Sequence, residues 1–200
     1  LRRLLPLYAR WSRRAGLRVH FLVVGGWLPR YLTERPDDVR DLRACTSLHV
    51  QTRRMRDDLR RMGLDNVELL PNFRRFPRDR AISGACQDPL RLVFLSRIIP
   101  EKGPELAVDA VERVNERSGR IVATLDLYGP VTKPARPWFD RLMAGSGAGV
   151  RYLGALPPGR VQERLAQYDA MLFPTYYSGE AFPGVVLDAM IAGIPVIASD

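Results

Sequence analysis

The sequence predicts an α/β fold built on parallel sheets. Short apolar runs alternate along the chain with segments whose apolar residues recur every three or four positions, and Gly or Pro residues separate them. The chain has 200 residues, 46% of them hydrophobic, which is enough to bury a core. A disordered chain is therefore excluded.

The first part of the chain, up to residue 73, alternates strands and helices. Tyr8 and Trp11 lie on one apolar stripe of a helix predicted over residues 4–15. Gly63 follows another helical stripe, at a position where a C-cap with positive φ is needed. The other predicted elements are strands at residues 18–24, 47–51 and 67–70 and helices at 29–32, 37–44 and 53–62.

A linker is predicted over residues 74–89, where prolines and charges occur without any helical stripe. We therefore divide the chain into a first domain (1–73), the linker and a second domain (90–200). The second domain contains predicted strands at 90–95, 121–128, 150–153, 170–173 and 194–198 and helices starting at 104 and spanning 138–143, 160–168 and 183–192.

The excess of positive over negative charge is confined to the first part of the chain. Residues 1–90 contain 19 Arg and 10 acidic residues, whereas residues 91–200 contain 12 of each sign. Such a surface attracts an anionic membrane, an acidic glycan or nucleic acid, although a solvated Arg-rich surface has the same composition. No apolar run approaches the roughly 18 residues of a membrane-spanning helix. Cys45 and Cys86 lack metal-binding spacing, so we expect reduced thiols in a cytoplasmic protein.

Polar residues follow the strands of the second domain, where ligands of open parallel sheets bind. These residues are Ser96, Arg97, Lys102, Gly129, Tyr176, Tyr177 and Glu180. Two cations, a glycine that exposes its backbone and a carboxylate suit a bound sugar diphosphate. The two tyrosines either stack on the sugar or base, or pack within the loop.

The last helix carries a second carboxylate. Gly184, Asp188 and Ala192 are spaced four residues apart and share one face, which we expect to leave room for a ligand. The core side is predicted to hold Val186, Leu187, Met190 and Ile191. Asp188 is expected to accept hydrogen bonds from ribose hydroxyls, and Glu180 from the sugar ring.

Four segments resemble the family 4 retaining glycosyltransferases, in that family's order. They are PTYYSGEAFPGVVLDAMIAGIPVIASD (174–200), LSRIIPEKG (95–103), VRYLGALPPGRVQERLAQYDAMLFPT (150–175) and VELLPNF (67–73). The resemblance implies a GT-B fold of two Rossmann-like parallel-sheet domains, both incomplete in this chain. The chain would then hold the end of the N-terminal, acceptor-side domain and most of the C-terminal, donor-binding domain.

The resemblance also implies roles for individual residues. Arg97 and Lys102 align with the pair that binds the donor diphosphate, Glu180 with the carboxylate that contacts the transferred sugar, and Asp188 with the glutamate that holds the ribose. The remaining donor-binding positions are Gly129, Gly154, Leu156, Ala181, Phe182, Pro183 and Gly184. The sequence departs from the family at Ser96 and Ala181, where glycine is usual, and at Asp188, which is shorter than glutamate.

The activity implied is metal-independent transfer of a hexose, with retention, from a nucleoside diphosphate sugar (UDP- or GDP-sugar) to a hydroxyl acceptor. The acceptor is a glycan or lipid in surface polysaccharide or glycolipid synthesis, and no cofactor or nucleic acid is expected. The protein should be cytoplasmic, touching the inner face of the membrane through its Arg-rich first 80 residues. We expect this piece alone to be inactive, because most acceptor contacts should lie upstream.

Other interpretations remain beside this one. A basic nucleic-acid-binding α/β module is the alternative, supported by charge alone. A nicotinamide-dependent dehydrogenase is disfavoured, since no Gly-x-Gly-x-x-Gly opens a helix. His20 and His49 are predicted to be hydrogen-bonded core histidines. The run at residues 25–27, Gly-Gly-Trp, either lines the acceptor cleft or makes a turn.

Overall fold

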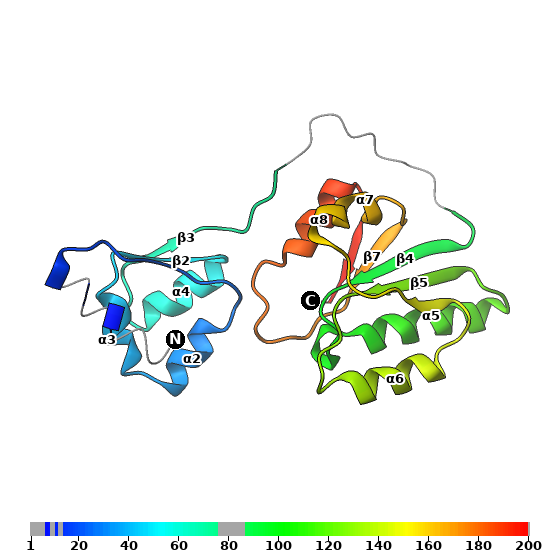
Figure 1. Cartoon of the computed structure of the whole chain (residues 1–200), viewed down its shortest axis with the longest axis horizontal. Helices are drawn as coiled ribbons and strands as arrows, with labels where there is room; N and C mark the ends of the chain where they lie inside the picture. Colours follow the sequence, from blue (N-terminus) through cyan, green and yellow to red (C-terminus); the bar gives the residue numbers. More distant parts are fainter. Residues whose placement is uncertain (1–6, 9–10, 12–13, 76–86, 200) are drawn as a thin grey trace. The chain divides into compact units, whose positions relative to one another are not determined.

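The computed structural model describes residues 7–8, 11, 14–75 and 87–199, which fall into two compact units (Figure 1). Unit 1 comprises Leu1–Phe73 and Ser178–Pro183, and unit 2 comprises Arg74–Tyr177 and Gly184–Asp200. Both contain parallel sheets with helices, which confirms the predicted fold class. Most of the helix predicted at 4–15, most of the linker and Cys86 lie outside the described residues.

Unit 1 contains a three-stranded parallel sheet in the order β1-β2-β3. The strands are β1 (His20–Leu22), β2 (Ser47–Val50) and β3 (Val67–Leu69), and the helices are α2 (Leu28–Glu34), α3 (Asp38–Arg43) and α4 (Arg53–Arg61). In α4 the Thr52 side chain accepts a hydrogen bond from the Met55 amide, an N-cap that fixes the start of the helix. Gly63 has φ +85°, as its predicted capping role requires.

The prediction of a core histidine is wrong for His20. Strand β1 pairs with β2 only among the described residues, and the His20 side chain is exposed. Both histidines are hydrogen-bonded as predicted: His20 Nδ1 lies 2.7 Å from Ser47 Oγ, and His49 Nε2 lies 2.8 Å from the same oxygen. His49 is half-buried. The apolar residues around His20 therefore mark a strand without marking a core position.

Unit 2 contains a five-stranded parallel sheet in the order β6-β5-β4-β7-β8. The strands are β4 (Leu90–Leu95), β5 (Ala123–Tyr128), β6 (Val150–Tyr152), β7 (Ala170–Phe173) and β8 (Val196–Ala198). The sheet grows from β4 in one direction through β5 and β6 and in the other through β7 and β8. The order therefore reverses between β4 and β7, the place where open α/β sheets bind ligands.

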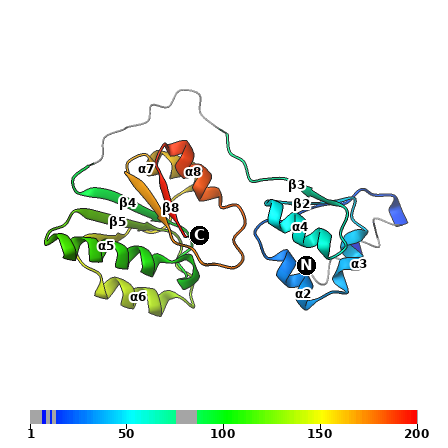
Figure 2. The ribbon, with the colours of Figure 1, turned by 180° about the vertical axis from the view of Figure 1, so that it is seen from behind.

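Helices cover both faces of this sheet (Figures 1 and 2). Helices α5 (Pro104–Ser118) and α6 (Arg136–Gly145) lie on one face, and α7 (Val161–Leu165) and α8 (Gly184–Ala192) lie on the other. Phe94, Leu125 and Phe139 belong to the core on the α5–α6 side. Val93, Met171 and Ala189 belong to the core on the α7–α8 side. Consecutive residues of β4 thus face opposite cores, as in a strand buried on both sides.

Two buried groups titrate away from their usual range. Asp126 on β5 accepts hydrogen bonds from Arg151 Nε at 2.8 Å and from the Tyr168 hydroxyl at 2.8 Å. Burial, together with these hydrogen bonds, raises the pKa of Tyr168. Burial also raises the pKa of Cys45, with a smaller contribution from Asp41, so this free thiol is held in its protonated form.

Candidate functional site

Two loops meet at the switch point of unit 2, and one of them carries both predicted diphosphate-binding cations. The loop after β4 contains Arg97 and ends in a 3-10 helix, η1 (Pro100–Lys102). The neighbouring strand β7 is followed by the loop that contains Tyr177. The carboxyl ends of parallel neighbours meet at one edge of the sheet, so the topology brings these loops together.

The structure places Arg97 and Lys102 over one aromatic ring. The Lys102 ammonium lies 4.7 Å from the centre of the Tyr177 ring, and the Arg97 guanidinium carbon lies 5.8 Å from it. Lys102 is only 6% exposed, whereas Arg97 is exposed. The Tyr177 ring therefore packs against the two cations of the loop after β4. The side chain of the neighbouring Tyr176 is 60% exposed.

Close backbone contact holds the two loops together. The Tyr176 amide donates a 2.9 Å hydrogen bond to the Glu101 carbonyl. Gly103 follows η1 with φ +74°, and a Cβ there would lie 2.0 Å from the Pro174 carbonyl oxygen. Only glycine fits both the conformation and the space at this position. The backbone directly after Lys102 is therefore held against the loop that follows β7.

The predicted glycines of the donor site lie at the ends of β5 and β6. The Gly129 amide donates to the Gly154 carbonyl at 2.9 Å, and the Gly129 carbonyl accepts from the Tyr152 hydroxyl at 2.8 Å. Both polar backbone groups of Gly129 therefore have partners inside the protein. Leu156 packs against the core on the α7–α8 side. Contact of these residues with a donor stays a prediction.

Asp188 lies in α8 with protein partners of its own. It is 9% exposed and accepts hydrogen bonds from Arg74 Nε at 3.1 Å and Gln162 Nε2 at 3.2 Å. The expected division of the helix faces is wrong, because Asp188 and Ala192 are buried whereas Met190 is 62% exposed. The helix is apolar on nearly every side, so its sequence period cannot distinguish the faces. Binding of ribose by Asp188 stays a prediction.

The segment that carries Glu180 groups with unit 1. The Gly26 amide donates to the Gly179 carbonyl at 2.8 Å, and a Cβ on Gly26 would lie 2.3 Å from the Glu180 carbonyl oxygen. The Asn72 side chain donates to the Phe182 carbonyl at 3.1 Å, and Ala181 packs against the unit 1 core. The Gly-Gly-Trp run therefore contacts the backbone of this segment. Pro183 ends the segment and Gly184 begins α8.

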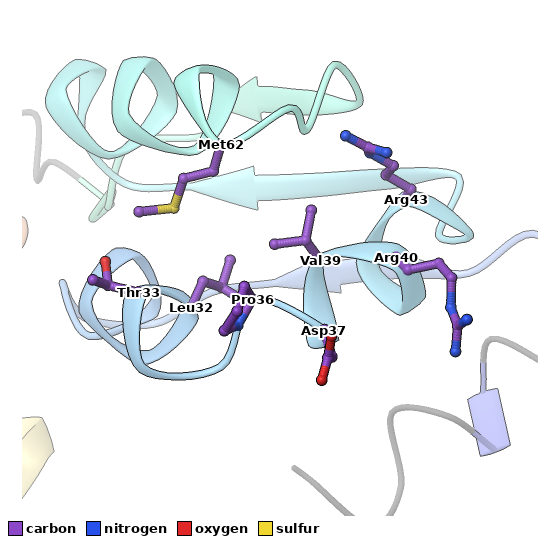
Figure 3. Close-up of a pocket in the computed structure, with 8 residues that line it drawn as sticks. All are labelled: Leu32, Thr33, Pro36, Asp37, Val39, Arg40, Arg43 and Met62. Carbon is purple, nitrogen blue, oxygen red and sulfur yellow. The ribbon is translucent and has the colours of Figure 1, made fainter.

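A cavity in unit 1 is lined by none of the predicted site residues. It measures about 790 Å³ and lies between α2, α3 and the end of α4 (Figure 3). Its lining residues are Leu32, Thr33, Pro36, Asp37, Val39, Arg40, Arg43 and Met62. Val39 and Met62 face the gap between the helices, whereas Arg40 points away from it. The Thr33 hydroxyl and Arg43 Nε donate to backbone carbonyls and Arg40 points away, so these polar groups do not converge on a ligand in the cavity.

Sequence reasoning missed the two side chains that hold Asp188. Arg74 precedes it by 114 residues and Gln162 by 26. Arg74 falls in the predicted linker and Gln162 in a helix, and neither position carries a local pattern that marks a partner for Asp188. Aligned relatives in which these positions vary together would reveal such a contact.

No helix in the described part of the chain is long and apolar enough to cross a membrane. No group of three or more His, Cys, Asp or Glu side chains in those ranges is arranged to hold a metal ion.

Comparison with known proteins identifies relatives of this chain. Residues 89–200 match the sequence family described as glycosyl transferases group 1. A D-inositol 3-phosphate glycosyltransferase of Rhodococcus erythropolis is 34% identical over 140 residues, which are 66% of this chain and 31% of that protein. Its namesake in Corynebacterium efficiens is 30% identical over 132 residues, 64% of this chain and 31% of that protein. The matched region thus spans about a third of these curated relatives.

The fold is shared with solved structures. Alr3699/HepE of Anabaena, solved in complex with UDP and glucose, superimposes with a TM-score of 0.72 at 15% identity, covering 99% of this chain and 57% of that chain. At this identity the likeness concerns the fold alone. It supports the GT-B type of the fold, which the sequence predicted.

Proposed function

The chain belongs to the group 1 glycosyltransferases, and on that premise we propose that it carries the donor-binding part of a retaining, metal-independent transferase. The enzyme would move a sugar from a nucleoside diphosphate sugar to a hydroxyl of a glycan or lipid-linked acceptor, in surface polysaccharide or glycolipid synthesis. The observation that carries the proposal is the convergence of the buried Lys102 and the exposed Arg97 on one ring at the switch point.

In the proposed reaction the two cations act on the diphosphate. Negative charge builds on the diphosphate as its bond to the sugar breaks, and fixed cations stabilise that charge more than they stabilise the bound donor. Glu180 would accept hydrogen bonds from the transferred sugar. Asp188 would accept them from the ribose, because its carboxylate has about four acceptor positions and its bonds to Arg74 and Gln162 do not use them all.

The nucleotide UDP is our first candidate for the donor, because the structurally similar Alr3699/HepE was solved with UDP. No cofactor is proposed beside the nucleotide sugar. Nothing in the comparisons supports the nucleic-acid-binding alternative, which depends on charge alone.

Arg97→Ala is expected to weaken binding of UDP roughly 10- to 100-fold, because a hydrogen bond to a charged group contributes about 1.5–3 kcal/mol. Glu180→Ala is expected to weaken binding of the UDP-sugar and to leave UDP binding unchanged. Isothermal titration calorimetry on the whole protein measures both. Arg113→Ala on the outer surface of α5 is the matched control, since Arg113 is 61% exposed.

Two results would count against the proposal. One is UDP-sugar binding that is unaffected by Arg97→Ala. The other is that the protein binds RNA in a filter assay and binds no nucleotide sugar. The identity of the nucleotide sugar can be sought by mass spectrometry of the nucleotide retained on purification.

We also propose that unit 1 touches anionic membrane. Its helix α4 carries five arginines at positions 53, 54, 56, 60 and 61, and each basic residue near an anionic surface contributes about 1 kcal/mol. We expect cosedimentation with vesicles that contain anionic lipid, at least tenfold weaker when Arg53, Arg54 and Arg61 are changed to Gln. Binding that is equal to neutral vesicles, or insensitive to salt, would contradict this.

A further inference from the structure

Tyr177 is the one residue in the described loops whose ring contacts both predicted diphosphate-binding cations. We propose that Tyr177 is a positioning residue, whose ring face holds Lys102 and Arg97 where the donor diphosphate binds. This inference rests on the proposed function, because it assigns a role within the same site.

The loop that carries the ring is hydrogen-bonded to the turn that carries Lys102. The Tyr177 amide donates to Thr175 Oγ1 at 3.3 Å, and Thr175 Oγ1 donates to the Glu101 carbonyl at 3.4 Å. Glu101 is the residue directly before Lys102 in η1. The loop that carries the ring is therefore tied to the turn that carries the ammonium, and the contact does not depend on a single flexible side chain.

An aromatic ring suits this task because it attracts a cation without cancelling its charge. The negative face of the ring attracts an ammonium or guanidinium group, and the attraction is stronger when the cation is desolvated, as the buried Lys102 is. A carboxylate in the same place would hold the cations but would also repel a diphosphate. Tyr177 brings no negative charge of its own to the place where the diphosphate would bind.

The phenol hydroxyl has no part in this role. Tyr177→Phe keeps the ring face and should keep the geometry, whereas Tyr177→Leu keeps the apolar volume and removes the attraction. Tyr8→Leu is the matched control, because it makes the same change at a tyrosine of unit 1 that is 50% exposed and belongs to no predicted site. If Tyr177 instead stacked on the base, its loss would weaken binding of the nucleoside itself.

The test uses three probes on the whole protein, by calorimetry: UDP, inorganic pyrophosphate and uridine. We expect Tyr177→Leu to bind UDP and pyrophosphate about tenfold more weakly and uridine unchanged, while Tyr177→Phe and Tyr8→Leu stay within about twofold of the wild type. Wild-type affinity of Tyr177→Leu for pyrophosphate would overturn the inference. So would an equal loss for uridine, or an equal loss in Tyr177→Phe.

A second measurement needs no ligand. In nuclear magnetic resonance spectra the Lys102 ε-methylene protons should be shifted upfield by the ring in the wild type and in Tyr177→Phe, and not in Tyr177→Leu. Absence of that shift in the wild type refutes the positioning role. A wild type that shows the shift but binds neither UDP nor pyrophosphate refutes the proposed function instead, so the two failures are distinguishable.

Discussion

Gly129→Ala is expected to destabilise unit 2 by about 4 kcal/mol or more, a large share of the 5–15 kcal/mol that stabilises a typical domain. Gly129 has φ +142°, a conformation that residues with a side chain rarely adopt, and an added Cβ would lie 1.6 Å from the Ser96 carbonyl oxygen. The atoms that the Cβ would meet belong to the backbone of Ser96 and Arg97, so they cannot move aside as a flexible side chain would.

Two other glycines separate the causes of this effect. Gly154 has φ +79° with no atom within 4 Å of an added Cβ, so Gly154→Ala measures the conformational cost alone, about 1–2 kcal/mol. Gly159 has neither a strained φ nor a close neighbour, and Gly159→Ala should change stability by no more than about 0.5 kcal/mol. The expected order of destabilisation is Gly129, then Gly154, then Gly159.

Urea unfolding followed by Trp138 fluorescence measures the series. Trp138 is the only tryptophan in unit 2, so changing Trp11 and Trp27 to Phe removes the signal of unit 1. Separate reporters matter because two units need not unfold in one step. If Gly129→Ala were as stable as Gly159→Ala, the close approach of the ends of β4 and β5 would be wrong.

The strands of unit 2 could be predicted because buried strands appear in the sequence as short apolar runs. β4 and β7 begin and end at the residues expected, since each is an apolar run buried on both faces and bounded by polar or turn residues. Strand β8 is shorter than expected and starts at Val196, because Pro195 has no amide hydrogen to donate to a sheet.

The parts that sequence could not predict depend on tertiary contacts. Helix α8 is apolar nearly all round, so nothing in its pattern showed that Met190 faces solvent. Burial of Lys102 was equally hidden, because lysines are rarely fully buried and its position follows from the loop after β7. The family resemblance picked out Lys102 and Asp188. Only the structure shows that Tyr177 contacts Lys102, and that Arg74 and Gln162 donate hydrogen bonds to Asp188.

Lys102→Met is expected to lower the rate of sugar transfer by about 10²- to 10³-fold, the usual cost of removing one group that stabilises charge on a reacting substrate. Methionine is unbranched and apolar, so it fills much of the same volume without the charge. The rate of transfer is measured on the whole protein as release of nucleoside diphosphate. The donor used is the nucleotide sugar that the protein retains on purification.

The free energy of unfolding of the same variant tells a functional charge from a structural one. Lys102 is 6% exposed, and taking an ammonium out of water costs several kcal/mol, which its contacts with the protein offset. Any loss of stability in Lys102→Met therefore measures what those contacts contribute to the fold, separately from the rate of transfer.

The chain supplies its own control, because Lys102 and Lys133 are its only lysines and Lys133 is exposed. Lys133→Met should change neither the transfer rate nor the free energy of unfolding by more than about 0.5 kcal/mol. If Lys102→Met instead unfolded unit 2 more easily and left the rate intact, the buried ammonium would be a structural group. A fall in rate in a Lys102→Met protein that is still folded under the assay conditions is the result that a diphosphate-binding cation requires, because such a variant has lost the charge that stabilises the departing diphosphate while keeping its fold.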